Sequence, residues 1–187
     1  MSKIEYLKKF KQASLEAIQK IKEEEIASII EVLDQCRRAR RQIFLIGNGG
    51  SAATATHFAN DLGKGASALE PRFRVLSLTD NVSWITALAN DLDYSQVFVE
   101  QLKNYAQPGD VVVAFSGSGN SPSIIAAVEW ARKHKCVTIG VTGRPGGKLA
   151  GAAETTLLIE SPHMAHIEEG HFIAQHLIGY YFMENPL

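Results

Sequence analysis

The segment from Ile43 to Asp61 places the strongest constraint on how this chain can fold. It begins with the apolar run Ile43–Ile46, which is typical of a strand buried on both faces of a parallel sheet. The turn Gly47–Gly50 follows, and its glycines permit a tight turn and close approach of a ligand to the backbone. Ser51 is expected to cap the alanine-rich helix that comes next, whose free N–H groups favour an anion. The segment therefore predicts a strand, an anion-binding turn and a helix.

Similar units recur along the chain. Runs of β-forming residues alternate with amphipathic stretches, which predicts an α/β fold with a parallel sheet covered on both faces. The expected later strands are 73–78, 111–115, 136–141 and 155–159, with helices at 82–89, up to 105, 122–134, 148–151 and 164–183. Residues 2–40 predict one long helix or two in succession. This is more helix than a small sheet needs, so we expect part of it to pack on another subunit.

The loop Ser116–Ser121 is a second candidate ligand site. It follows a buried strand, precedes a helix that begins at Pro122, and contains three serines, two glycines and an asparagine. Hydroxyl groups and backbone N–H groups in such a loop can hold a phosphate without a lysine. The alternative is an ordinary turn between strand and helix, but that would need fewer hydroxyl groups.

Titratable side chains gather on two of the predicted helices. His57 and Asp61 are one turn apart and share a helix face. The final helix carries Glu168, Glu169, His171 and His176 on an otherwise apolar sequence. Together these groups indicate either a proton-transfer set or a divalent metal site with nitrogen and oxygen ligands.

Composition excludes several classes of protein. The chain has 187 residues with a formal net charge of −1, which suits one α/β domain and indicates neither a nucleic-acid nor a membrane partner. No apolar run approaches the roughly 20 residues of a membrane span, and the polar start does not resemble a signal peptide, so a cytoplasmic protein is expected. Cys36 and Cys136 are expected to be buried thiols. The basic run 37–41 is interpreted as a solvated helix end rather than a nucleic-acid patch.

Nucleotide-binding motifs fit poorly. Residues 47–52 match the loose pattern G-x-G-x-x-A, but Asp80 comes too late for the usual acidic residue and a second nucleotide-binding half is lacking. A nicotinamide-dependent dehydrogenase is therefore the weakest hypothesis.

Several motifs together resemble the sugar-isomerase (SIS) domain family, and more closely its phosphoheptose isomerase branch. The resemblance covers nearly the whole chain. It rests on Gly47-Asn48-Gly49-Gly50-Ser51, His57-Phe58-Ala59, Asn90-Asp91, Gly109-Asp110-Val111, Ser116 through Ser121, and Thr142-Gly143 with Gly146 through Gly151.

The resemblance implies a single SIS domain over residues 1–187, with a helical segment at 1–41 and an α/β core at 42–187. It implies a three-layer αβα sandwich with a five-stranded, flavodoxin-like parallel sheet, and a homotetramer with its sites at subunit interfaces. The implied activity is aldose–ketose isomerisation of sedoheptulose 7-phosphate to D-glycero-D-manno-heptose 7-phosphate through an enediol. The alternative is a non-catalytic SIS module similar to the DnaA initiator-associating proteins.

The same resemblance implies roles for individual residues. Asp61 and His176 would be the catalytic pair, and a metal ion, often zinc in the family, would be held by His57, Asp61, Glu168 and His176. The sugar phosphate would contact Asn48, Gly49, Gly50, Ser51, Asp61, Asn90, Asp91, Ser116, Gly117, Ser118, Ser121 and Glu168.

Two departures from the family pattern matter, and a third, Gly117 between the loop serines, is mild. Asp61 replaces a glutamate and so loses roughly 1.5 Å of reach. Glu168 replaces a glutamine, and its added charge would favour a bound cation or raise the pKa of a neighbouring carboxyl group.

Overall fold

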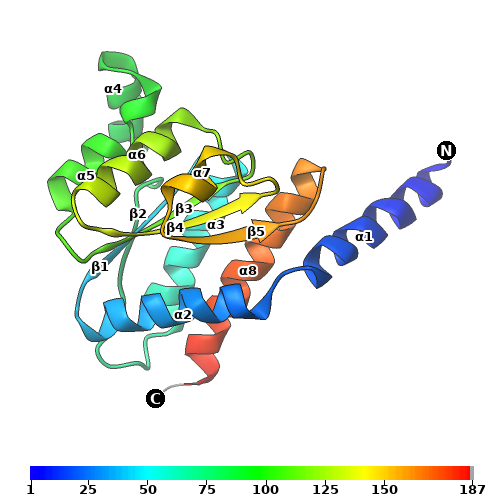
Figure 1. Ribbon diagram of the computed structural model, residues 1–187, viewed down its shortest axis with the longest axis horizontal. Helices are drawn as coiled ribbons and strands as arrows, with labels where there is room; N and C mark the ends of the chain where they lie inside the picture. The colour runs from blue at the N-terminus through cyan, green and yellow to red at the C-terminus, as the bar shows by residue number, and fades with distance from the viewer. Residues whose placement is uncertain (186–187) are drawn as a thin grey trace.

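The computed structural model describes residues 1–185 and contains a five-stranded, all-parallel sheet (Figure 1). The strand order is β2-β1-β3-β4-β5, the flavodoxin-like arrangement that the family resemblance implies. The strands are β1 (Gln42–Gly47), β2 (Arg74–Ser77), β3 (Val111–Ser116), β4 (Val137–Gly143) and β5 (Thr155–Ile159).

Helices cover both faces of the sheet, which makes the three layers of the sandwich (Figure 1). One face packs against α2, α3 and α8, and the other against α5, α6 and α7. The helices are α1 (Lys3–Gln19), α2 (Glu23–Arg38), α3 (Gly50–Asn60), α4 (Val82–Asp91), α5 (Val99–Tyr105), α6 (Pro122–Lys133), α7 (Gly147–Ala152) and α8 (Met164–Glu184). A π-helical turn, η1 (Asp61–Gly65), continues α3, and a 3-10 turn, η2 (Tyr94–Gln96), precedes α5.

The apolar run in β1 shows why both faces must be covered. Ile43 and Leu45 pack in the core beneath α2, α3 and α8, whereas Phe44 and Ile46 pack in the core beneath α5, α6 and α7. All four side chains are fully buried. Because successive side chains of a strand point to opposite faces, a run that is apolar throughout needs a helix layer on each side.

The N-terminal segment forms two helices, one of the two arrangements expected. Figure 1 shows α1 projecting away from the sheet, and its inner side contacts α8, where the ring of Phe10 lies 4.6 Å from that of His166. The outer side leaves apolar residues exposed, including Ile4, Leu7 and Leu15. Among residues 1–185, each helix is too short or too polar to cross a bilayer.

The basic run at the end of α2 is only partly solvated, so the interpretation as a solvated helix end is wrong for Arg37. This side chain is buried and its guanidinium donates to Asp34 at 2.7 Å and 2.9 Å and to the Pro71 carbonyl at 2.8 Å. Arg38 is exposed, as expected. The two cysteines are buried free thiols, also as expected.

Candidate active site

Two loops meet at the carboxyl ends of β1 and β3. The chain leaves β1 toward β2 on one side and leaves β3 toward β4 on the other, so the strand order reverses between them. Asn48 links the two loops because its Nδ2 donates to Ser123 Oγ in the first turn of α6, at 2.9 Å. In open α/β sheets, ligands bind in the crevice at such a reversal.

The first loop turns sharply into α3. Gly49 has a φ of +54°, and a Cβ at Gly47 would collide with the Ser51 carbonyl oxygen. The helix begins at Gly50 with Gly49 as its N-cap, so the prediction that Ser51 caps the helix is wrong. Because the glycines start the helix earlier, Ser51 lies buried within its first turn, where its N–H donates to the Asn48 carbonyl at 3.0 Å.

The second loop is braced by its own side chains and by the start of α7. Ser116 is buried and its hydroxyl lies 3.3 Å from that of Ser121. Ser118 Oγ accepts the Asn120 N–H at 3.2 Å, and Asn120 Oδ1 accepts the Lys148 N–H at 3.1 Å. These contacts fix the positions of the three serine hydroxyls.

The loop also presents the N-terminus of a helix. Ser121 is the N-cap of α6, yet its side chain makes no capping hydrogen bond, and Pro122 occupies the first turn. Pro122 has no N–H group, and the Ile124 N–H bonds to the Ser121 carbonyl at 3.0 Å. The Ser123 N–H and the hydroxyl proton of Ser121 therefore remain available to an anion, which the helix dipole also favours.

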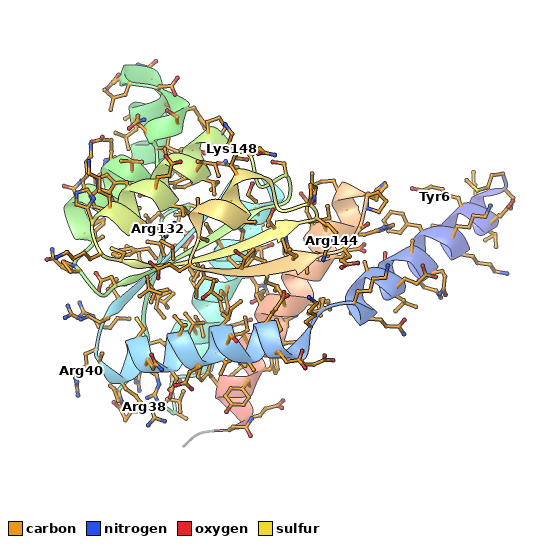
Figure 2. All side chains as sticks on the ribbon, in the orientation of Figure 1. Tyr6, Arg38, Arg40, Arg132, Arg144 and Lys148 are labelled. Carbon is orange, nitrogen blue, oxygen red and sulfur yellow. The ribbon has the colours of Figure 1, made fainter. Side chains whose placement is uncertain are left out.

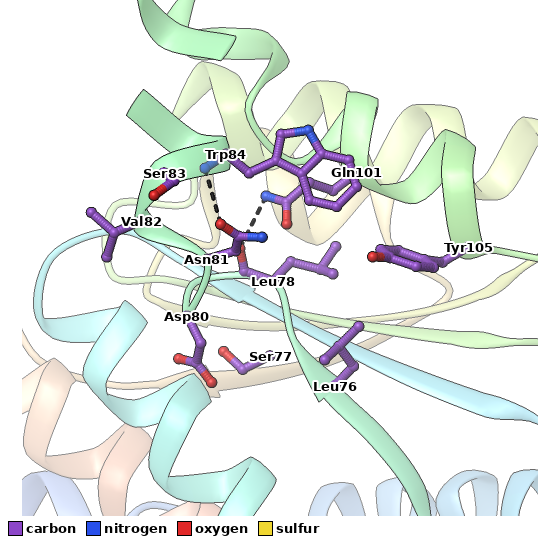
Figure 3. Close-up of a pocket in the computed structure, with 10 residues that line it drawn as sticks. All are labelled: Leu76, Ser77, Leu78, Asp80, Asn81, Val82, Ser83, Trp84, Gln101 and Tyr105. Carbon is purple, nitrogen blue, oxygen red and sulfur yellow. Dashed lines mark hydrogen bonds between the residues drawn. The ribbon is translucent and has the colours of Figure 1, made fainter. Parts of the chain in front are cut away.

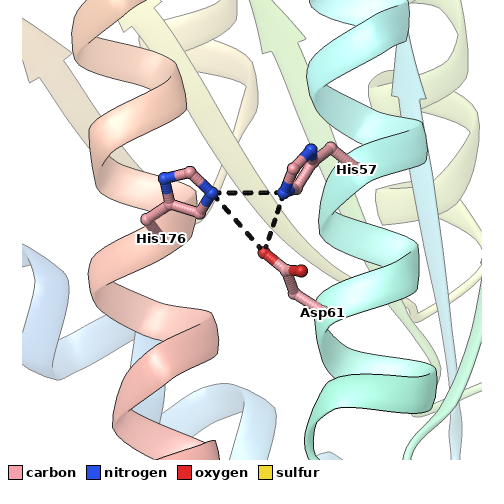
Figure 4. A group of neighbouring side chains, drawn as sticks. All are labelled: His57, Asp61 and His176. Atoms are coloured by element: carbon pink, nitrogen blue, oxygen red, sulfur yellow. Dashed lines mark hydrogen bonds and ion pairs between the residues drawn. The ribbon is translucent and has the colours of Figure 1, made fainter.

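A cluster of three titratable side chains lies between α3 and α8 (Figure 4). His57 and His176 point toward one another with their Nε2 atoms 3.1 Å apart, and Asp61 Oδ2 lies 3.4 Å and 3.9 Å from these nitrogens. The backbone changes from α to π geometry at Asp61, and such π turns frequently occur at functional sites. All three residues belong to one chain.

This cluster suits a divalent metal ion. Asp61 is buried, and its Oδ2 has no hydrogen-bond partner among the described residues, which is costly for a carboxylate oxygen unless a cation or another donor occupies the site. One carboxylate oxygen and two imidazole nitrogens all lie within 4.8 Å of one another. Two histidines and one carboxylate, with a position left open, form a ligand set typical of catalytic zinc.

The structure does not bring Glu168 into this cluster. It precedes His176 by eight residues, about 12 Å along α8, and its exposed carboxylate lies beside the start of α3, where a Cβ on Gly50 would be 3.0 Å from Oε1. The expected metal ligand is thus placed beside the first loop instead. Asn90 and Asp91 are exposed at the end of α4, and their side chains bond to each other at 2.8 Å.

Two side chains at the crevice were not predicted from the sequence. The hydroxyl of Tyr94 in η2 donates to Asn48 Oδ1 at 2.9 Å, and Ser123 accepts from the other side of the same amide. Ser123 lies two residues after Ser121 and could have been suspected from the serine-rich sequence. Tyr94 carries no local signal, because its contact spans 46 residues.

A buried imidazole lies behind the second loop. His171 on α8 is fully buried, and its ring lies 6.1 Å from that of Phe115. Burial lowers the pKa of His171 to about 4, against a smaller opposite effect of the nearby Thr142 backbone. Its side chain is therefore neutral at pH 7 and belongs to the core rather than to the titratable cluster.

Comparison with known proteins agrees with this geometry. The SIS domain family model matches residues 5–143. A phosphoheptose isomerase of Desulfovibrio desulfuricans is 40% identical over 154 residues, which cover 80% of this chain and 73% of the relative. A probable phosphoheptose isomerase of Thermoplasma acidophilum is 37% identical over 171 residues, covering 91% and 94%.

Comparison of the fold with solved structures also finds phosphoheptose isomerases. The structure of the phosphoheptose isomerase from Neisseria gonorrhoeae superposes with a TM-score of 0.89 at 32% identity, covering 98% of this chain and all of that one. That of Francisella tularensis gives 0.88 at 26% identity, covering 99% of this chain. The chain belongs to the SIS domain family and, within it, to the phosphoheptose isomerases.

Proposed function

We propose that the protein interconverts sedoheptulose 7-phosphate and D-glycero-D-manno-heptose 7-phosphate through an enediol. The observation that carries the proposal is the placement of the His57–Asp61–His176 cluster relative to the two loops. His57 lies seven residues into α3 from Gly50, which is about 10 Å along the helix. The start of α3, which borders the crevice, and the cluster are thus separated by a length of the order of an extended seven-carbon chain, with C–C bonds of about 1.5 Å.

The serine loop would anchor the phosphate. Ser116, Ser118 and Ser121 offer hydroxyl groups, and the start of α6 offers the Ser123 N–H, at one end of the crevice. Binding energy from a phosphate remote from the reacting carbons holds C1 and C2 in position, which lowers the entropic cost of the reaction. Asn48 and Tyr94 would define the wall along the sugar.

Asp61 and His176 would move the protons. Conversion of the ketose to the enediol requires removal of a proton from C1 and delivery of a proton to the C2 oxygen. Formation of the aldose then requires delivery of a proton to C2 and removal of the proton from the C1 hydroxyl. Asp61 Oδ2 and His176 Nε2 face His57 within the cluster, where they would hold a metal ion, so Asp61 Oδ1 and His176 Nδ1 would remain to exchange protons with the substrate. Burial of Asp61 limits the access of water to this carboxylate.

We also propose that zinc binds at His57, Asp61 and His176. The bound ion would polarise the oxygen atoms of the substrate and stabilise the charge of the enediol. Glu168 would add negative charge beside the sugar rather than ligate the ion in this arrangement.

A homotetramer is the proposed assembly. Support comes from the outer side of α1 and from the end of α8, where large apolar or aromatic side chains are exposed. They include Ile4, Tyr6, Leu7, Leu15, Leu177, Tyr180 and Tyr181. Light scattering after size-exclusion chromatography measures the assembly directly.

The non-catalytic alternative is not favoured, because a binding module has no need of two imidazoles and a buried carboxylate that converge. An isomerase assay with zinc-loaded and chelator-treated protein tests the proposal. We expect turnover of the heptulose phosphate that falls on chelation and returns with zinc, and a His134→Gln variant, altered at an exposed histidine far from the site, should behave like the parent. Lack of turnover by folded, zinc-supplied protein would contradict it.

A further inference from the structure

A second cleft lies at the opposite end of the sheet from the candidate active site. It is formed where α2 leads into β1, where β2 begins, and at the turn before β3. Its volume is about 220 Å³, several times the roughly 30 Å³ that one water molecule occupies. The cleft can therefore hold a phosphate group with part of an attached molecule. Its walls include Arg40, Arg41, Arg74, Phe44, Tyr105 and Asp110.

The charge in this cleft is unbalanced. Arg40, Arg41 and Arg74 are exposed, and none lies within salt-bridge distance of a carboxylate among residues 1–185. The one acidic wall residue, Asp110, is buried and committed to the backbone, since its oxygens accept the N–H groups of Gln42 at 2.9 Å and Gln107 at 2.8 Å. Three guanidinium groups thus face a single carboxylate whose oxygens already accept backbone N–H groups, which leaves the cleft with an excess of positive charge.

The backbone at the end of α2 holds one of these arginines at an unfavourable conformation. The N–H of Arg40 bonds to the Arg37 carbonyl at 2.9 Å and that of Arg41 to the Cys36 carbonyl at 3.0 Å, which is the Schellman pattern. Glycine is the usual residue at the left-handed position of this motif, yet Arg40 occupies it with a φ of +55°. Arg74 Nη1 donates to the Arg40 carbonyl at 3.0 Å, which holds the Arg74 guanidinium against the backbone of Arg40.

Figure 2 shows Arg40 at the end of α2, apart from Lys148, which adjoins the serine loop. The strands β1 and β3 each join the cleft at one end to an active-site loop at the other. Each strand has six residues, so roughly 17 Å separate its ends. The cleft is thus distinct from the site where the substrate phosphate is proposed to bind.

We propose that this arginine cleft binds a phosphorylated small molecule. Guanidinium groups match phosphate oxygens in paired hydrogen bonds, and three of them around a small cavity suit a phosphate ester or pyrophosphate better than a carboxylate. Tyr105, which stacks on Phe44 with a 25° angle between rings, supplies a flat wall for the part that the phosphate carries. The proposal does not depend on the proposed isomerase activity.

The neighbouring cleft, on the other side of Tyr105, differs in character (Figure 3). Two of its polar side chains are hydrogen-bonded to the backbone: Gln101 Nε2 donates to the Leu78 carbonyl at 3.0 Å, and Asn81 Oδ1 accepts the Trp84 N–H at 3.0 Å. The ring of Trp84 meets that of Tyr105 edge-on at 5.8 Å. Because Tyr105 also borders the arginine cleft, Trp84 fluorescence should report an occupant there.

Calorimetric titration with inorganic pyrophosphate at fixed ionic strength tests the proposal. A Ser116→Ala/Ser118→Ala/Ser121→Ala background removes the three hydroxyl groups proposed to hold phosphate at the serine loop, so that binding at the arginine cleft dominates what is measured. In that background we expect Arg40→Gly to weaken binding about tenfold, the loss of one charged hydrogen-bonding group. The same change should raise the melting temperature by a few degrees, because glycine adopts the left-handed conformation without strain.

A gain in stability together with a loss of affinity distinguishes an arginine placed for a ligand from one that merely supports the fold. Arg74→Gln should also weaken binding, whereas Arg132→Gln, which removes the same charge from another exposed surface, should not. Absence of pyrophosphate binding in the serine-loop background, or equal affinity in the Arg40→Gly and parent proteins, would overturn the proposal.

Discussion

Acidification should destabilise this protein through His171 more than through any exposed histidine. Its imidazole is fully buried against Phe115, and neither ring nitrogen has a hydrogen-bond partner within the described chain. Burial lowers its pKa from the ordinary 6.5 to about 4. That difference corresponds to about 3 kcal/mol between the two protonation states, at 1.36 kcal/mol for each tenfold change.

The direction of the effect follows from which state binds the proton. Between pH 6.5 and 4 the unfolded chain protonates His171 and the folded protein does not, so falling pH favours unfolding. The contribution of His171 is complete above pH 6.5 and is lost as the pH falls toward 4. Stability should therefore drop by about 3 kcal/mol from this residue alone.

Urea unfolding of the parent and a His171→Leu variant at pH 7 and pH 4 measures how much His171 contributes to the pH dependence of the free energy of unfolding. Leucine removes the buried nitrogens at similar volume, so the two proteins should be within about 1 kcal/mol at pH 7. At pH 4 the variant should be more stable by about 3 kcal/mol, while a His134→Gln control follows the parent. Equal losses between pH 7 and pH 4 in the parent and His171→Leu would refute the reasoning.

Three further predictions concern the site and the core. Asp61→Asn should lower kcat by about 10²–10⁴-fold in steady-state kinetics. It should also reduce the zinc retained after dialysis, as measured by metal analysis, and a normal zinc content would contradict the proposed ligand role. Gly119→Ala should cost about 1–3 kcal/mol in urea unfolding, because φ is +64° and a Cβ would collide with the Gly146 carbonyl oxygen; an unchanged midpoint would contradict this. Burial raises the pKa of Cys36 to about 12 and of Cys136 to about 11, so a thiol reagent at pH 8 should label both only after unfolding.

The sequence predicted the fold well where one physical rule dominated. The strand at 155–159 and the helix start at Pro122 were predicted with their observed limits, since a buried apolar run and a proline are strong local signals. The reversal of strand order also followed from the family resemblance, and it brings the two glycine loops together.

Details that depend on contacts between distant segments were not predictable in this way. Burial of Arg37 requires the Pro71 carbonyl, 34 residues away. Glu168 lies apart from the metal cluster because it precedes His176 by eight residues along α8. Matching its position to the ligands of a family does not take this length into account. Pairing of Tyr94 with Asn48 depends on how η2 packs over the crevice.

The central claim is that Asp61 acts on a phosphate-anchored heptose. Nuclear magnetic resonance of sedoheptulose 7-phosphate incubated with zinc-loaded protein tests it most directly. The parent and Asp61→Asn proteins are compared at substrate concentrations that give the same fraction of substrate-bound protein. We predict that the parent forms the aldose phosphate, and that the variant binds the substrate but converts it at least 100-fold more slowly. Unchanged conversion by Asp61→Asn, or no conversion by the folded, zinc-loaded parent, would contradict the claim.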